Sequence, residues 1–174
     1  FRSLEMATLV ADQIRVINAN DPRKRPCTSQ ASCLHLNSPW FTSTGPFDIE
    51  DMITVGYADS PMFGYDAYST EDYFIGCDAE LLFSLAGGRE LINGEWNVHG
   101  QDARIAARSY WSMFAKGFQG VDTWQLHDHP RNWVYSMWGM LKDDFTPRDK
   151  LAAISDANHE IHRLERLLRH ARRV

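Results

Sequence analysis

Three short stretches of this sequence combine acidic, amide and aromatic side chains in a pattern that suits chemistry on a polar ligand. The first runs from Asn93 to His99 and places Trp96 and Asn97 beside Glu95. A carboxylate at the end of a buried strand is costly unless it is paired or functional. Glu95 is therefore the first candidate for a catalytic carboxylate, such as the nucleophile of a retaining glycoside hydrolysis. A surface glutamate in a strand-to-helix loop is the simpler alternative.

The second stretch covers residues 123–129 and ends a predicted strand with Trp124 and His127. An indole face can stack on a sugar ring, and an imidazole can hold a hydroxyl group. The ligand types of a metal-dependent hydrolase are also present, at Glu95, His99, His127, Asp128 and His129. No pair of these has a diagnostic metal-ligand spacing, so a sugar pocket is favoured and no metal site is predicted.

The third stretch, residues 64–68, places Asp66 and Tyr68 at the end of another predicted strand. An aspartate in this position can orient a substrate or tune a neighbouring carboxylate. An aspartate that only caps the following loop is an equally good interpretation.

Hydrophobic periodicity predicts helices and strands in strict alternation. The predicted helices are residues 1–20, 79–86, 102–116 and 146–173, with a single helical turn at 48–52. The predicted strands are residues 26–36, 62–68, 91–98 and 121–127. Asp102 is a natural cap and Gly117 a natural end for one helix, and Thr146 with Pro147 would begin the last.

Alternation of this kind indicates parallel strands joined by helical crossovers, so the fold class is α/β. A doubly wound sheet and a (β/α)8 barrel both fit. The polar residues at the predicted strand ends favour the barrel, which carries its chemistry there. The sequence contains no glycine-rich phosphate loop, which counts against a nucleotide-binding sheet.

The chain length sets a further expectation. The sequence has 174 residues and supplies four predicted strands, whereas a whole barrel needs about 250 residues. Four strands cannot close a barrel and would leave two edges and an open core. We therefore expect another chain or segment to complete the barrel, in a longer product or an oligomer, or else an open four-stranded sheet. The start at Phe1 rather than Met fits a piece of a longer product.

Composition narrows the possible partners. The net charge of −5 gives nothing that attracts a phosphate backbone, so no nucleic-acid partner is predicted. The three cysteines have no paired spacing, so no disulfide framework is implied and a CxxC zinc site is excluded. No stretch is long and apolar enough to span a membrane. No cofactor is predicted, and a carbohydrate is the expected ligand.

Nearly the whole chain resembles the second half, strands five to eight, of the catalytic barrel of family-42 β-galactosidases and their relatives among retaining glycosidases. The stretches that carry the resemblance are residues 18–30, 61–69, 81–100, 107–129 and 139–168. The resemblance implies one partial barrel domain over residues 1–174 that acts on β-galactoside-like sugars. It aligns Glu95 with the family's nucleophile and Trp124 with the aromatic residue of the eighth strand.

The resemblance also implies what this chain lacks. The family's acid/base is a glutamate that follows an asparagine at the end of the fourth strand, which would lie upstream of Phe1. Asp66, Tyr68, Asn97 and His127 would hold the sugar hydroxyls. Because one carboxylate cannot serve as both nucleophile and acid/base, a non-catalytic relative that binds carbohydrate or is purely structural remains the alternative.

Overall fold

The computed structural model describes residues 2–28, 30–31, 48–66, 72–97, 102–128 and 138–170. Within these ranges one parallel sheet contains β1 (Gln30–Ala31), β2 (Met62–Tyr65), β3 (Glu90–Asn97) and β4 (Gly120–Trp124). The helices are α1 (Arg2–Asn20), α3 (Ile49–Asp51), α4 (Asp72–Ala86), α5 (Ala103–Ala115) and α6 (Asp149–His170). A π-helical turn, η1 (Met52–Gly56), continues α3.

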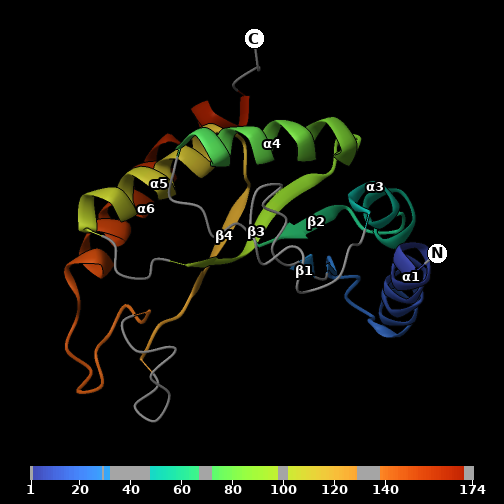
Figure 1. Cartoon of the computed structure of the whole chain (residues 1–174), viewed down its shortest axis with the longest axis horizontal. Coiled ribbons are helices and arrows are strands. Elements are labelled where there is room, and N and C mark those ends of the chain that lie inside the picture. The colour runs from blue at the N-terminus through green and yellow to red at the C-terminus, as the bar shows by residue number, and fades with distance from the viewer. Residues whose placement is uncertain are drawn as a thin grey trace.

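The strands pair in the order β1-β2-β3-β4, which is also their order along the chain. Figure 1 shows α4, α5 and α6 along one side of this sheet, with α1 and α3 beyond its β1 end. Parallel strands are joined by crossover connections, which nearly always have the same handedness. When successive crossovers move along the sheet in the same direction, their helices lie on the same face. A doubly wound sheet reverses direction, whereas a barrel does not. The predicted alternation is confirmed, and the described part has the topology of a barrel segment.

The core lies between the sheet and its helical layer. Phe63 of β2 and Leu91 of β3 are fully buried on this side. Trp96 of β3 packs against Tyr110 of α5, with the ring centroids 5.6 Å apart. Complete burial of an aromatic or leucine side chain stabilises a fold by about 1.5–3 kcal/mol. These contacts identify the face of each strand that is turned towards the helices.

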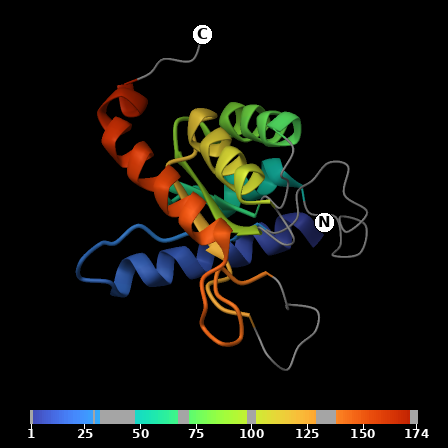
Figure 2. The same ribbon diagram turned by 90° about the vertical axis from the view of Figure 1, so that its left-hand side faces the viewer.

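The first helix joins the same core through the π-helical turn. Ala7, Val10 and Ile14 of α1 are buried at helical spacing, as the sequence pattern predicted. They belong to the same buried cluster as Ile53 of η1. Tyr57 follows η1 and meets Phe63 edge to face, with the ring centroids 4.8 Å apart. Figure 2 shows α1 in blue below α4 and α5, and Figure 1 shows it beyond the β1 end of the sheet, where this chain of contacts holds it.

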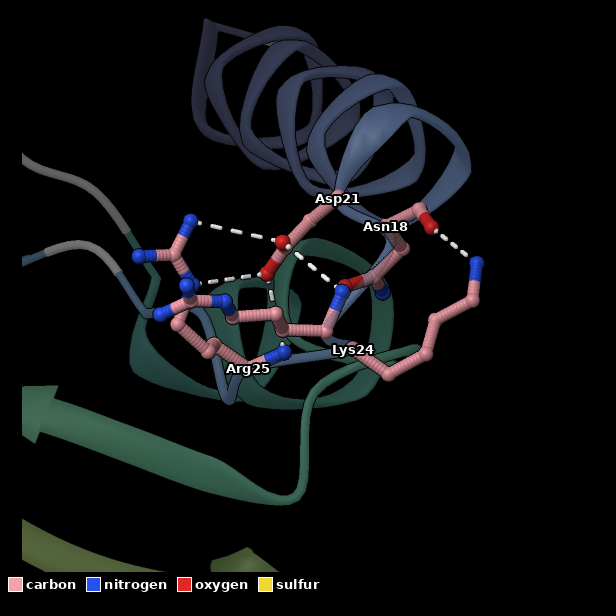
Figure 3. Close-up of polar contacts among 5 residues, drawn as sticks. Asn18, Asp21, Lys24 and Arg25 are labelled. Atoms are coloured by element: carbon pink, nitrogen blue, oxygen red, sulfur yellow. Dashed lines mark hydrogen bonds and ion pairs between the residues drawn. The ribbon is translucent and has the colours of Figure 1, made fainter.

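Asp21 ends α1 and turns the chain towards β1. Its carboxylate accepts hydrogen bonds from the backbone N–H groups of Arg23 and Arg25, at 3.1 and 2.9 Å. The Arg25 guanidinium also donates to it at 3.0 Å, and this side-chain bond is the main reason that the pKa of Asp21 is lowered. Lys24 Nζ donates to the carbonyl of Asn18 at 2.6 Å, near the end of α1 (Figure 3). A short polar network therefore supplies the partners that a helix end lacks.

The helix predicted at residues 102–116 is confirmed as α5. Its N-cap is Asp102, whose carboxylate accepts the backbone N–H of Arg104 at 2.7 Å. Gly117 follows the helix with a φ of 97°, a conformation that only glycine adopts readily. Both local signals therefore fixed the bounds of α5 correctly.

Two predicted helix starts are wrong. The helix predicted from Ala79 begins earlier, at Asp72. The last helix begins at Asp149 and not at Thr146. The Thr146 hydroxyl donates to Asp144 at 2.6 Å, and the Arg148 N–H donates to the Met140 carbonyl at 2.9 Å. The preceding loop therefore holds the residues that were expected to start the helix.

The strand predicted at 91–98 matches β3 within one residue at each end, and the other three predicted strands are longer than the described ones. The strand predicted at 26–36 is represented by β1 alone, and residues 32–36 lie outside the described residues. The strand predicted at 62–68 ends at Tyr65, and that predicted at 121–127 ends at Trp124. None of the described helices combines the length and the apolar character needed to cross a membrane.

We predict that Gly117→Ala destabilises the fold more than Gly87→Ala. Both glycines have positive φ, which costs about 1–2 kcal/mol for alanine. Only at Gly117 would the new methyl group also collide, 2.8 Å from the Phe83 ring, and such overpacking adds about 1–3 kcal/mol. Urea denaturation followed by circular dichroism measures both losses. Equal losses would contradict the packing of Phe83 on Gly117.

Candidate functional site

The carboxyl ends of β2 and β3 bring two acidic side chains together. Tyr65, the last residue of β2, pairs in register with Asn93 of β3. Asp66 follows directly and comes level with the Gly94–Glu95 segment. Burial raises the pKa of Asp66, and the negative charge of nearby Glu95 raises it further, so the two carboxyl groups interact. The expected meeting of these two strand-end carboxylates is therefore present in the structure.

A β-bulge in β3 sets the direction of Glu95. Asn93 pairs with Val121 and Trp96 pairs with Thr123, so β3 contains one more residue than β4 over this interval. Asn93 and Trp96 both face α5: the Asn93 amide contacts the sulfur of Met113 at 3.2 Å, and Trp96 packs on Tyr110 as described above.

The side chain of Asn93 also supports the bulge from within. Its Oδ1 accepts the backbone N–H of Glu95 at 3.3 Å, a donor that the bulge removes from the regular ladder. Because Asn93 and Trp96 occupy the helical face, half-buried Glu95 is turned to the opposite face of the sheet. On that face it meets Asp66.

Asp66 is almost completely buried, with 1% of its surface exposed. Its Oδ1 atom has no hydrogen-bond partner among the described residues. Burial, and then repulsion by Glu95, raises the pKa of Asp66 from 3.8 to about 7. Asp66 is therefore a neutral carboxylic acid in mildly acidic solution, and the half-buried side chain of Glu95 lies next to it.

Trp124 lies on the same face as Glu95. Thr123 is the register partner of Trp96 and so faces the helices, which turns Trp124 to the other side. Trp124 pairs in register with Asn97, two residues beyond Glu95, and is 39% exposed. The peptide bond between Trp124 and Gln125 is cis. An accessible indole thus stands one strand away from Glu95 and two strands away from Asp66.

His127 follows β4 in a loop that returns to α6. Its ring stacks on Phe145, with centroids 4.3 Å apart and planes inclined by 20°. Its Nε2 atom is buried and has no hydrogen-bond partner in the described part of the chain. The backbone of His127 forms a bridge with Leu141. No described contact joins His127 to Glu95 or Asp66, so its proximity to them stays a prediction.

Asp128 closes the base of this loop and was missed by the sequence analysis except as a metal-ligand type. It is 2% exposed, accepts the Gly139 N–H at 2.6 Å and forms an ion pair with Arg148. Lys150, 4% exposed, donates to the Trp138 carbonyl at 3.2 Å. Burial and the nearby Arg148 lower the pKa of Lys150 to about 8. These contacts, here called the Asp128 clasp, fix the segment that carries His127.

Several residues named from the sequence lie outside the described residues: Tyr68, His99 and His129. Asn97 is the last residue of β3, and only its backbone is described. In the described part of the chain, no three histidine, cysteine, aspartate or glutamate side chains gather closely enough to hold a metal ion. Cys27 and Cys77 are free thiols.

A cavity of about 360 Å³ lies away from these carboxyl groups. It is lined by Tyr110 and Phe114 of α5, by Ile161 and Leu168 of α6, and by Gly120 at the start of β4. It therefore lies at the opposite end of β4 from Trp124. In barrels the amino ends of the strands contribute to stability and the carboxyl ends to chemistry, so the carboxyl edge is the candidate site.

No family model matches this chain, and no curated protein matches it. Solved structures do match. A β-galactosidase from the psychrophilic Marinomonas ef1 gives a TM-score of 0.70 at 14% identity, over 95% of this chain and 28% of its own. A β-galactosidase from the Antarctic haloarchaeon Halorubrum lacusprofundi gives 0.68 at 16% identity, over 91% and 25%. An exo-β-1,3-glucanase from Aureobasidium namibiae gives 0.59 at 12% identity, over 84% and 58%.

At such identities the similarity shows the fold alone. The chain has the α/β fold of part of a (β/α)8 barrel, as seen in glycoside hydrolases. It spans about a quarter of the length of the two β-galactosidases that it matches. The resemblance seen in the sequence is therefore supported for the barrel, whereas membership of family 42 has no matching family model.

We predict that Asp66→Asn changes how stability depends on pH. Between pH 3.8 and about 7 the folded protein keeps a proton on Asp66 that the unfolded chain has released. This contribution to stability is present at low pH and is lost as pH rises through that window, on the order of 4 kcal/mol in total at 1.36 kcal/mol per pKa unit. The Asp66→Asn variant has no carboxyl group at this position, so it does not lose this stability as the pH rises.

Comparing urea unfolding of Asp66→Asn and the unchanged protein at several pH values isolates this group from all others. The variant should gain stability relative to the unchanged protein as pH rises to neutrality. A constant difference across the window would show that Asp66 keeps its ordinary pKa.

Proposed function

We propose that residues 1–174 form the second half, strands five to eight, of the catalytic barrel of a retaining glycoside hydrolase that acts on β-galactoside-like sugars. The observation that supports this best is the placement of Glu95. It lies at the carboxyl edge of a parallel sheet, beside buried Asp66 and on the same face as exposed Trp124. Two of the solved structures with this fold are β-galactosidases.

In this proposal Glu95 is the nucleophile. Its carboxylate attacks the anomeric carbon, and the bond to the leaving oxygen breaks as that oxygen takes a proton from an acid/base glutamate. The product is a glycosyl ester on Glu95. Water then attacks the same carbon, gives its proton to the acid/base residue and releases Glu95. The acid/base glutamate lies outside this chain in our proposal.

The remaining residues bind the sugar. The exposed face of Trp124 stacks on a sugar ring, a contact that buries apolar C–H groups without burying hydroxyls. Asp66, Tyr68, Asn97 and His127 hold hydroxyl groups around it. Trp124 and Asn97 come level with each other on adjacent strands, so both stand beside a ring that reaches Glu95.

We further propose that another chain or segment supplies strands one to four. Within the described sheet, β1 and β4 have one neighbouring strand each. Unpaired edges invite association, and barrel closure removes them. Added strands alongside β1 and β4 would also enclose the face that carries Glu95.

This arrangement makes a prediction about β4. Backbone amides of Gly120–Trp124 should exchange hydrogen more slowly in the assembled protein than in residues 1–174 alone, because a second neighbour completes their pairing. Amides of α5, which is covered in both, serve as the reference. Equal protection of β4 in both samples would contradict barrel closure at this edge.

The central prediction concerns Glu95→Gln in the assembled protein. The amide is nearly isosteric but cannot attack the anomeric carbon, so turnover of a β-galactoside should fall by at least about 10³-fold while the fold is retained. Glu90→Gln is the matched control, because Glu90 is an exposed glutamate at the other end of the same strand. Its turnover should be unchanged.

A mechanism-based label tests the role directly. A 2-fluoro β-galactoside should leave a trapped sugar on the peptide that contains Glu95, found by mass mapping. A label on another carboxylate, or full activity in Glu95→Gln, would refute the assignment. Loss of activity with a chelator and its return with metal would instead support the metal-dependent alternative.

A further inference from the structure

The backbone that follows Trp124 pairs with a second segment of the chain. The N–H of Met140 donates to the Gln125 carbonyl at 2.9 Å, and the N–H of Leu141 donates to the Leu126 carbonyl at 2.8 Å. These bonds run between extended backbone segments, as in a sheet. The residues just beyond Trp124 therefore have a fixed neighbour, although β4 itself has ended.

Asp128 fixes the position of this second segment. Its carboxylate accepts the Gly139 N–H at 2.6 Å, one residue before Met140, and forms an ion pair with Arg148. The backbone N–H of Arg148 donates to the Met140 carbonyl at 2.9 Å. Both contacts of the Asp128 carboxylate therefore lead to Met140, whose own N–H holds the residue after Trp124.

Gly139 shows how closely the carboxylate and this segment fit together. A methyl group at Gly139 would lie 2.7 Å from Asp128 Oδ1 and 2.6 Å from the Leu141 carbonyl oxygen, closer than side-chain carbons normally come. Asp128 is also 2% exposed, so the contact is closed to water. Only glycine lets the backbone approach a buried carboxylate so directly.

Stability alone explains this arrangement poorly. The burial of two opposite charges is repaid only when their remaining donors and acceptors also find partners. Here the Arg148 Nε atom is buried and has no hydrogen-bond partner in the described part of the chain. What a buried pair of this kind can supply is one defined position for the backbone that it holds. In the proposed function, Trp124 is the side chain beside that backbone that needs a defined position.

We propose that Asp128 is a positioning residue for sugar binding: it holds residues 139–141 against the backbone that follows Trp124 and thereby fixes the indole against the sugar ring. This rests on the proposed function, in which Trp124 stacks on the sugar. Asp128 itself touches neither the sugar nor the reacting atoms. Because Glu95 lies on β3, loss of the ion pair should raise KM and leave kcat nearly unchanged.

The first test observes the indole without a ligand. The chain contains six tryptophans, and in assembled protein labelled with 5-fluorotryptophan the ¹⁹F signal that Trp124→Phe removes reports on this ring. Asp128→Asn keeps the size of the side chain but removes its charge, so this signal should broaden or split. The signal of buried Trp96, identified with Trp96→Phe, should keep its shift and width.

Asp21 provides the matched control. It too is a largely buried aspartate, with 8% of its side chain exposed, that accepts backbone N–H groups and pairs with an arginine (Figure 3). It lies before β1, the strand at the other end of the sheet from β4. Asp21→Asn should therefore leave the Trp124 signal unchanged. If both variants alter that signal equally, the effect is a general loss of stability and the inference fails.

The second test is a double-mutant cycle on ligand binding. Calorimetry measures the affinity of the assembled protein for methyl β-D-thiogalactoside, whose sulfur linkage resists hydrolysis. Trp124→Ala should raise the dissociation constant about tenfold, as the loss of one aromatic contact does. Asp128→Asn should raise it several-fold in the unchanged protein and not at all in Trp124→Ala, because it acts through that ring. Independent, additive effects would contradict the positioning role.

The remaining outcomes separate this inference from the function that it rests on. Arg148→Gln removes the same ion pair from its partly exposed partner, and it carries the same expectations if Asp128→Asn does not fold. A Trp124 signal that is sharp and unshifted in the folded variant would overturn the inference alone. Unchanged thiogalactoside binding in Trp124→Ala, or no binding at all, would overturn both the sugar contact and this inference. The 2-fluoro label on Glu95 decides the nucleophile independently.

Discussion

Parallel pairing is the constraint on which the rest of this structure depends. Because two parallel strands cannot be joined by a tight turn, every connection must return along the sheet, and here α4 and α5 make the returns on one face. The carboxyl ends of three successive strands then lie at one edge, where Asp66 follows β2, Glu95 lies near the end of β3 and Trp124 ends β4. The same constraint leaves the opposite face without a described helical cover. The side chains on that face do not pack against the helices, so they are available for chemistry.

Local signals in the sequence predicted some elements well and others poorly. Asp102 and Gly117 act on the backbone within one turn of themselves, so their effects were visible without any knowledge of the fold. Thr146 and Pro147 give an equally clear local signal for a helix start, and it is wrong. Their backbone instead follows contacts with Leu141 and Asp144, which a single sequence does not reveal. Tertiary contacts therefore decided the bounds wherever a loop folded back on itself.

In the site, too, some features could be predicted from the sequence and others depended on tertiary contacts. The alternation of elements was enough to predict that Asp66 and Glu95 meet, since strand ends in a parallel sheet share an edge. The burial of Asp66 and its missing partner were not predictable, because they depend on residues distant in sequence. The bulge had a weak signal in the Asn93-Gly94 pair, which is typical of irregular backbone. His127 was placed on a strand by its pattern, but the Asp128 clasp holds it in a loop.

The bulge in β3 has a consequence for how such a barrel diverges. A regular strand couples the position of every side chain to the register of its neighbours, so an active residue cannot move without moving the core. One extra residue at Gly94 removes that coupling, because Asn93 and Trp96 remain packed on α5 on either side of it. Deleting Gly94 would restore the regular pleat and draw Glu95 back along the strand by about 3.3 Å. Related chains can thus change the reach of their carboxylate by insertion or deletion at one position, and an alignment that permits no gap inside a strand would pair the wrong residues.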